Sequence, residues 1–359
     1  MNILITGGCG FLGSNIAMSY LEKGASVCVV DALFRKGSSE NLKWLSAHPE
    51  SNNLLTFYQL DIANENDLDA VFQKQAPFDY VCHLGGQVAM TTSLSDPRRD
   101  FLTNSKGTFN VLEAIRMHCP DAFLAYSSTN KVYGDLKRFN YKENQTRYFL
   151  EEYPNGFDES LPLDFASPYG CSKGSADQYV HDWFRNFEIK TVVFRHSSIY
   201  GGRQFASFDQ GWIGWFCQKA IEQKENYNKG KKIEPFSMSG TGKQVRDVLH
   251  AEDLIHLYHT AYEKKESVAG EIFNIGGGIE NSLSLLELFS LLEDLLEYQT
   301  EEKLQYYQLE RRKSDQDFFV ANISKAKEVM DWEPEISVKN GIQKMIGWVK
   351  KNKTGEGYE

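Results

Sequence analysis

The stretch NILITGGCGFLG, residues 2–13, decides the fold of this chain. Its first residues form an apolar run typical of a buried strand, and a glycine-rich turn follows directly. An amphipathic segment at 14–23 then predicts a helix, and a second apolar run at 25–30 ends at Asp31. Strand, glycine turn, helix and strand, with an acid about 20 residues on, form the unit that binds a dinucleotide.

The glycines of this turn have separate roles in such a unit. Gly7 lets the turn tighten, Gly10 lets the backbone approach a pyrophosphate, and Gly13 lets the helix pack on the strand. The helix N-terminus adds unpaired N–H groups for the phosphates, and Phe11 and Leu12, just before it, are further cofactor-binding candidates. The spacing differs from G-x-G-x-x-G, and a glycine loop by itself is also typical of an ordinary strand-to-helix turn.

Asp31 discriminates between the two nicotinamide dinucleotides. Its carboxylate is suited to accept hydrogen bonds from both ribose hydroxyls and would repel a 2′-phosphate, so the sequence favours NAD over NADP. Arg35 and Lys36 follow closely, and cations of this kind could hold such a phosphate. The alternative roles are solvated loop charges or, for Arg35, an arginine stacked on the adenine.

The rest of the first half repeats the alternation of strands and helices. Repeated strand–helix units predict a parallel sheet with right-handed crossovers and a ligand at the carboxyl ends of the strands. The predicted fold class is α/β, a Rossmann-type doubly wound sheet over 1–196, with a smaller, mainly helical substrate lobe over 197–359 from which some segments return. The predicted strands are 54–60, 78–84, 122–127 and 190–194, and the predicted helices are 65–74, 100–118 and 168–185. The expected elements of the lobe are helices at 212–224, 251–263, 283–296 and 338–350 and a short strand and turn at 273–277.

The carboxyl ends of these strands supply the other cofactor candidates. A carboxylate after the strand at 54–60 is placed to meet the adenine, and small residues at the end of the strand at 122–127 lie where the nicotinamide would be. A glycine pair after the strand at 78–84 either lets the backbone pass close to the cofactor or makes a plain turn. The candidates so placed are Asp61, Ile62, Leu84, Gly85, Gln87 and Ser127.

Tyr169 and Lys173 form the candidate catalytic pair, because a four-residue spacing projects both side chains from one helix face. A tyrosine pKa of about 10 makes a poor base at neutral pH, and a fixed ammonium one turn away lowers that pKa. Thr129, at the end of a strand, would hydrogen-bond a substrate oxygen and share its proton with Tyr169. The alternatives are an exposed helix face for the pair and a strand cap for Thr129.

With these motifs the chain resembles the extended short-chain dehydrogenase/reductase superfamily, which contains nucleotide-sugar epimerases and dehydratases. The resemblance runs from residue 1 to about residue 351. It implies that Thr129, Tyr169 and Lys173 match the catalytic Ser/Thr, Tyr and Lys of the superfamily. In those roles Tyr169 is the acid or base, Lys173 binds the nicotinamide ribose and lowers the tyrosine pKa, and Thr129 orients the substrate hydroxyl.

One departure from the superfamily pattern separates the reactions. In its sugar 4,6-dehydratases an Asp-Glu pair follows the Thr and does the acid/base work of removing water. This chain has Asn130 and Lys131 at those two places, and neither can serve as that acid or carboxylate. The departure disfavours dehydration and leaves hydride chemistry without elimination.

Five longer stretches of this chain are similar to one subgroup of the superfamily, the CDP-tyvelose (CDP-paratose) 2-epimerases. The resemblance implies that bound NAD oxidises carbon 2 of a CDP-linked deoxyhexose and returns the hydride to the opposite face, with no net redox change. The alternatives are a UDP-hexose 4-epimerase and a non-catalytic nucleotide-sensing protein. The similar stretches are 86–93, 128–135, 194–198, 200–206 and 209–212, and 226–232 is an insertion relative to the subgroup.

Arginines are the candidates for holding the substrate diphosphate. The net charge is −10 and the pI about 5.4, so local cations have to overcome a repulsive overall field. By resemblance Arg246 and Arg312 match diphosphate-binding arginines of the family, and Arg203 is a third candidate. A surface ion pair is the alternative role for each. The remaining substrate-binding candidates are Thr129, Asn130, His196, Ser198 and Gln204.

Composition sets the remaining expectations. No apolar run approaches the length of a membrane span, the glycine turn begins too near residue 1 for a signal peptide, and the six cysteines show no metal or disulfide spacing. We therefore expect a cytoplasmic protein without a metal, whose partner is a CDP-sugar and not a nucleic acid or a membrane. A homo-oligomer, as a dimer or a dimer of dimers, is expected, with the helix at 168–185 as a candidate face.

Overall fold

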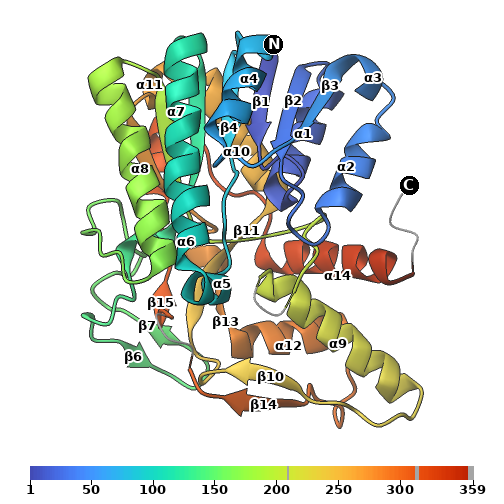
Figure 1. Cartoon of the computed structure of the whole chain (residues 1–359). Coiled ribbons are helices and arrows are strands. Elements are labelled where there is room, and N and C mark those ends of the chain that lie inside the picture. Colours follow the sequence, from blue (N-terminus) through green and yellow to red (C-terminus); the bar gives the residue numbers. More distant parts are fainter. Residues whose placement is uncertain (208–209, 312–314, 355–359) are drawn as a thin grey trace.

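Within residues 1–207, 210–311 and 315–354, which the computed structural model describes, a seven-stranded parallel sheet forms the centre of the chain (Figure 1). The strand order is β12-β8-β5-β4-β1-β2-β3, so the chain builds outward from β1 in one direction and then crosses to build in the other. The predicted doubly wound α/β class is confirmed. The strands are β1 (Asn2–Thr6), β2 (Ser26–Asp31), β3 (Leu55–Gln59), β4 (Tyr80–His83), β5 (Phe123–Thr129), β8 (Thr191–His196) and β12 (Glu271–Ile275).

Helices cover both faces of this sheet, because its strands are apolar on both sides. Ile3 and Ile5 of β1 pack into the core on one face and Leu4 into the core on the other, as the alternation of a strand requires. The helices packed on the Ile3 face are α1 (Phe11–Glu22), α2 (Ser38–Ser46), α10 (Ala251–Glu263) and α13 (Ser324–Met330). The helices packed on the Leu4 face are α4 (Glu65–Gln75), α7 (Gly107–His118) and α8 (Pro168–Phe187).

The smaller lobe lies beyond the carboxyl ends of the strands, at the bottom of Figure 1. Its core lies between three helices and a strand, α9 (Trp212–Asn228), α12 (Leu285–Leu295), α14 (Val338–Thr354) and β10 (Phe236–Ser239). Its other strands are β9 (Ser198–Tyr200), β11 (Val245–His250), β13 (Ser282–Ser284), β14 (Tyr306–Leu309) and β15 (Phe318–Phe319). Short elements elsewhere are α3 (Ser51–Leu54), α5 (Met90–Ser95), α6 (Pro97–Asp100), α11 (Lys265–Val268), β6 (Lys142–Glu143) and β7 (Tyr148–Phe149). None of the described helices combines the length and the apolar character needed to cross a membrane.

Two segments that we expected to build the substrate lobe are part of the larger lobe: a helix that packs on the central sheet and a strand that extends it. Helix α10 packs its Leu254 and Leu257 into the sheet core beside α1. Strand β12 pairs in parallel with β8 and forms one edge of the sheet, so the strand expected at 190–194 does not complete it. Both expectations were wrong, because an amphipathic pattern shows that a face is buried but not which core receives it. The division of the chain at residue 196 stays a prediction.

The single helix expected at 100–118 is interrupted by a π-helical turn at Phe101–Lys106, between α6 and α7. Asn104 of this turn accepts a hydrogen bond from Gln87 N at 2.8 Å and donates to Gln87 O at 3.0 Å. Its Nδ2 also donates to Ser172 Oγ at 2.9 Å. The irregular turn therefore connects the loop after β4 to α8 and fixes both beside the cavity described below.

Candidate active site

A cavity of about 510 Å³ opens at the carboxyl ends of the parallel strands. The glycine turn and the residues that follow β2, β3, β4 and β5 all reach it, since the carboxyl ends of parallel strands meet at one edge of the sheet. The expected residues that line it are Gly7, Gly10, Phe11, Leu12, Gly13, Asp31, Arg35, Asp61, Ile62, Leu84, Gly85, Gln87, Ser127, Thr129, Tyr169, His196, Arg203 and Gln204.

Close backbone contacts in the glycine turn leave no room for side chains. Gly7 has φ +66°, and a Cβ there would lie 2.8 Å from Gly85 N. A Cβ at Gly13 would lie 2.2 Å from Gly7 O. Gly10 precedes α1 and has no side chain to cap it, so the first N–H groups of this helix remain for a ligand in the cavity. This arrangement fits the diphosphate of a dinucleotide.

Asp31 ends β2, and backbone groups of two turns hold its carboxylate. Oδ2 accepts from Cys9 N at 2.9 Å and Oδ1 from Leu33 N at 2.7 Å. Burial raises the pKa of Asp31, while these N–H groups and the charge of Arg35 act in the opposite direction. A fixed acceptor in the cavity wall, one strand away from the glycine turn, fits the ribose hydroxyls of NAD.

Tyr169 and Thr129 meet where β5 and α8 border the cavity. Pro168 begins α8, and Ser167 Oγ caps it by accepting from Gly170 N at 3.0 Å, so Tyr169 is fixed in the first turn. Burial raises the pKa of Tyr169 to about 12, and its hydrogen bond with Thr129 lowers it. The structure thus brings together the two residues that the sequence assigned to one substrate oxygen.

Lys173 lies one turn further along α8 and is not among the residues that line the cavity. Its Nζ donates to Ser127 O at 2.5 Å and lies 4.3 Å from the centre of the Tyr126 ring. Burial lowers the pKa of Lys173 to about 7. The neighbour that chiefly lowers the pKa of Tyr169 is Thr129. Because the Lys173 ammonium is directed to the Ser127 carbonyl here, its expected effect on the pKa of Tyr169 stays a prediction.

A buried ionic network behind the catalytic residues was not foreseen. Arg195 of β8 binds Asp177 of α8 through Nε at 2.9 Å and Nη2 at 2.8 Å, and Ser128 Oγ donates to the same carboxylate at 2.6 Å. Arg195 Nη1 also donates to Tyr133 Oη at 2.9 Å. The network joins β5, β8 and α8 and fixes the end of β5. A signal existed in the sequence, since Asp177 follows Lys173 by four residues on one helix face.

His196 lines the cavity from the end of β8 and is buried there as a neutral ring. Burial lowers the pKa of His196 to about 3, and the nearby charge of Lys173 adds to the shift. Among the described residues neither ring nitrogen has a hydrogen-bond partner. A ligand in the cavity would therefore find one donor and one acceptor on this ring.

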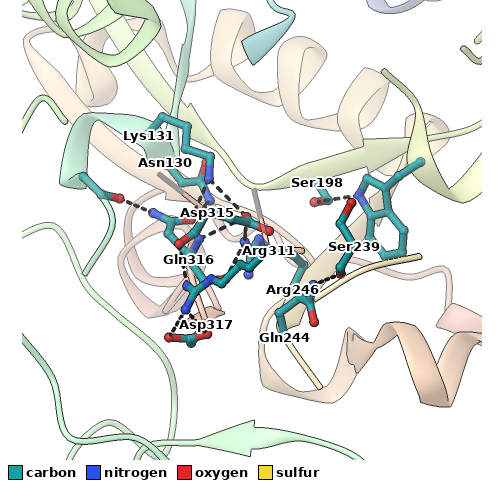
Figure 2. Close-up of polar contacts among 12 residues, drawn as sticks. Asn130, Lys131, Ser198, Ser239, Gln244, Arg246, Arg311, Asp315, Gln316 and Asp317 are labelled. Atoms are coloured by element: carbon teal, nitrogen blue, oxygen red, sulfur yellow. Dashed lines mark hydrogen bonds and ion pairs between the residues drawn. The ribbon is translucent and has the colours of Figure 1, made fainter. Parts of the chain in front are cut away.

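A second polar cluster lies outside the cavity and joins the smaller lobe to the turn that follows β5 (Figure 2). Arg246 Nη2 donates to Asp315 Oδ1 at 2.7 Å and to Gln316 O at 2.8 Å. Gln316 Oε1 accepts from Asn130 Nδ2 at 3.2 Å and from Lys131 Nζ at 3.4 Å. Burial lowers the pKa of Lys131 to about 8, and the charge of Arg246 adds to the shift. These five residues are called the arginine cluster below.

Ser198 and Arg312 are the remaining expected substrate residues, and Ser198 belongs neither to the cavity lining nor to the arginine cluster. Ser198 Oγ accepts from Trp212 Nε1 at 3.3 Å within the lobe (Figure 2). Arg312 lies outside the described residues. Its neighbour Arg311 forms an ion pair with Asp317 at 2.9 Å beside the arginine cluster, and nothing in its sequence position marked it.

Comparisons with known proteins agree with one another. The family described as GDP-mannose 4,6 dehydratase matches residues 4–345. The CDP-paratose 2-epimerase of Salmonella typhi is 54% identical over 348 residues, which cover 97% of this chain and 99% of that protein. The solved structure of UDP-glucose 4-epimerase from Thermotoga maritima with UDP-glucose is 29% identical, with 98% and 99% of the two chains covered and a TM-score of 0.79. That of UDP-glucuronic acid 4-epimerase from Bacillus cereus, in complex with UDP-glucuronic acid and NAD, is 26% identical, with 98% and 100% covered and a TM-score of 0.78.

Proposed function

The chain belongs to the GDP-mannose 4,6-dehydratase family, within the predicted short-chain dehydrogenase/reductase superfamily, and from this premise we propose that it inverts carbon 2 of a CDP-linked deoxyhexose. The proposed reaction converts CDP-paratose into CDP-tyvelose with bound NAD. The observation that carries the proposal is the 54% identity, over nearly the whole of both chains, to CDP-paratose 2-epimerase. Asn130 and Lys131, at the place of the dehydratase Asp-Glu pair, support epimerisation over loss of water.

The residues that line the cavity would hold NAD. The glycine turn and the N-terminus of α1 suit the diphosphate, and Asp31 suits the adenosine ribose. Bound NAD would accept the carbon-2 hydrogen as a hydride and return it to the opposite face. Because the hydride removed from carbon 2 has to be returned to the same sugar, the chain needs to bind this cofactor tightly from one turnover to the next.

Tyr169 is assigned to proton transfer. The hydrogen on carbon 2 is not acidic because no carbonyl is adjacent, so the hydroxyl on this carbon loses its proton as the carbon is oxidised. Tyr169 Oη accepts that proton and later returns it, while Thr129 Oγ1 holds the same oxygen. Because burial raises the pKa of Tyr169 to about 12, the resting hydroxyl is protonated, and the accepting form needs a nearby cation. Lys173, one helical turn away, is assigned to supply that charge.

The arginine cluster is assigned to the substrate diphosphate. Arg246 and Lys131 are two cations against the single carboxylate of Asp315, so the cluster is positive in a protein of net charge −10. A guanidinium held by a carboxylate and a backbone carbonyl is already oriented for phosphate oxygens. Asn130 of the cluster directly follows Thr129 of the cavity, so the two sites adjoin.

Product stereochemistry tests the reaction. The purified chain is incubated in deuterium oxide with CDP-paratose and, separately, with UDP-glucose, and the products are examined by NMR. We expect inversion at carbon 2 of the CDP-sugar with no deuterium there. Deuterium at carbon 2 would contradict return of the hydride, and inversion of UDP-glucose at carbon 4 would favour the alternative 4-epimerase.

We further propose that the protein is a homodimer that pairs through α7 and α8. These helices lie side by side on one flank of the molecule (Figure 1), and large apolar side chains are exposed along them. Analytical ultracentrifugation of Phe109→Glu should show a monomer where the unchanged chain sediments as a dimer. The exposed apolar residues are Phe109, Met117, Tyr179 and Phe187.

The cytoplasm is the proposed location. All six cysteines are free thiols, which suits a compartment that keeps thiols reduced. Fractionation of the source cells with an antibody against the chain tests this placement.

A further inference from the structure

A segment from the second half of the chain crosses the edge of the cofactor cavity. Residues 201–205, called the strap here, follow β9 and run past the glycine turn and α2. Arg203, Gln204 and Phe205 of the strap line the cavity together with residues of the first half. The sequence suggested Arg203 and Gln204 as substrate contacts, but the structure sets them beside the part of the cavity formed by the glycine turn.

Two amide side chains of the first half hold the backbone of the strap. Asn15 Nδ2 donates to Gly202 O at 3.1 Å. Asn41 Nδ2 donates to Cys9 O at 3.1 Å and to Arg203 O at 3.4 Å. Asn41 is buried, and it joins the strap directly to the turn that suits the diphosphate.

Arg203 anchors the strap to α2 through a contact with Trp44. Its guanidinium carbon lies 4.1 Å from the centre of the Trp44 ring, a close cation–π contact. The backbone of Arg203 has φ +67°, a left-handed conformation that is unfavourable for a residue with a side chain. Such a conformation persists where the surrounding contacts require it, and it is often found at ligand sites.

Phe205 provides a second anchor between two helices. A Cβ at Gly37, the residue just before α2, would clash with the Phe205 ring, so the ring rests directly on this glycine. The other side of Phe205 meets Trp348 of α14 edge-on, with ring centres 5.4 Å apart. The strap is therefore wedged between the cofactor half and the C-terminal helix.

Two buried acceptors, one in the strap and one beside it, lack a hydrogen-bond donor within the described residues. Within the described residues, Asn41 Oδ1 and Gln204 Oε1 have no hydrogen-bond partner, and both residues line the cavity. A buried acceptor without a partner is costly, so a ligand that brings hydroxyl or amide donors would be favoured here. The adenosine half of a dinucleotide carries such groups.

We propose that the strap retains the dinucleotide between turnovers and that Arg203, seated on Trp44, is the positioning residue that keeps the strap closed. The proposal rests on the proposed function, because an enzyme that returns the hydride it removed has to keep its cofactor. It assigns Arg203 to retention of the cofactor and not to the substrate diphosphate.

The rate of NAD release tests the strap. The full chain is loaded with radiolabelled NAD, diluted into excess unlabelled NAD, and the bound label is followed with time. Arg203→Ala and Trp44→Ala should each release NAD roughly tenfold faster, as loss of a partly buried cation–π contact implies, and Trp44→Phe should fall between. Arg138→Ala is the matched control, because Arg138 stacks on Phe139 at 5.2 Å and does not line the cavity.

Other outcomes separate the strap from the function it serves. An unchanged rate of NAD release in Arg203→Ala and Trp44→Ala would overturn the proposal for the strap and leave the proposed function intact. The same holds if the KM for the CDP-sugar rises while the rate of NAD release is unchanged. An unchanged chain that neither carries nor binds NAD would overturn the proposed function and the strap with it. If Arg203→Ala unfolds, Asn15→Ala, which removes one bond to the strap, should still release NAD about two- to threefold faster.

Discussion

The cavity at the sheet edge and the arginine cluster of the lobe are made of different parts of the polypeptide. Backbone groups form one side of the cavity, at the glycine turn, the N-terminus of α1 and the N–H groups around Asp31. Side chains make the arginine cluster, and they come from β11, from the turn after β5 and from the residues before β15. There charges are paired directly, as Arg246 and Asp315 are at 2.7 Å, and Lys131 adds a further positive charge.

This difference decides what a substitution removes at each site. A Cβ in the glycine turn meets backbone that cannot move away, so the cavity depends on the fold itself. Truncation of a side chain in the arginine cluster leaves the sheet intact but leaves a neighbouring charge without its partner. The cavity should therefore control whether chemistry occurs, and the cluster should control how tightly the sugar nucleotide is held.

The largest expected effect belongs to the cavity. Tyr169→Phe removes the hydroxyl that transfers the proton but keeps the packed ring, so turnover should fall roughly 10²–10⁴-fold with unchanged NAD content. Initial rates and the absorbance of bound NAD measure the two quantities. Tyr179→Phe, on an exposed face of the same helix, is the control and should keep full turnover. Near-normal turnover in Tyr169→Phe would contradict the assignment of proton transfer to Tyr169 in the cavity.

Arg246→Ala should affect binding more than chemistry. Loss of a charge-assisted contact to a diphosphate, about 1.5–3 kcal/mol, should raise the KM for the CDP-sugar roughly 10–100-fold and change kcat much less. Steady-state kinetics over a wide substrate range measures this division. Arg147→Ala, which breaks a pair with Glu287 in the same lobe, should leave KM unchanged. An unaltered KM in Arg246→Ala would show that the arginine cluster is structural.

Asp247, the residue after Arg246, should make the stability of the chain depend on pH. Burial raises the pKa of Asp247 from 3.8 to about 7, so the folded chain keeps a proton that the unfolded chain releases at lower pH. This stabilisation is complete below pH 3.8 and is lost as the pH rises through about 7. Between pH 5 and pH 8 the Tm of the unchanged chain should therefore fall roughly 2–4 °C more than that of Asp247→Asn. Equal slopes in calorimetry, with the exposed Asp331→Asn as control, would contradict the assignment.

The smallest effect is expected at Cys171, which lies between Tyr169 and Lys173 on α8. Its side chain is exposed, and its thiol donates to Phe165 O at 3.3 Å, away from the cavity wall. Cys171→Ala should keep turnover within a factor of two and stability within about 0.5 kcal/mol. Cys171→Ser is measured in parallel. A large loss of turnover in both variants would indicate that the Cys171 thiol takes part in the reaction.

The prediction from sequence succeeded where local chain geometry was sufficient. The glycine turn and the strand ends depend on short stretches whose periodicity and spacing are visible in the chain. The approach of Tyr169 to Thr129 was expected from the resemblance to the superfamily, because the two residues lie on separate elements. The prediction failed for the placement of α10 and β12, whose local patterns are those of any helix and strand. It also missed the Asp177–Arg195 pair, because the two residues are neighbours only after β8 lies beside β5.

Local sequence patterns were sufficient to predict the parallel sheet, the cavity at its carboxyl edge and the glycine turn that lines it. These follow from hydrophobic periodicity and from glycines that only certain turns accommodate. The tertiary structure alone decided which charges of the lobe pair with one another, and it set Arg203 on Trp44 beside the cofactor cavity. The physical reason is that a side-chain contact depends on the meeting of segments far apart in the chain, while a turn or a strand end depends on its own few residues.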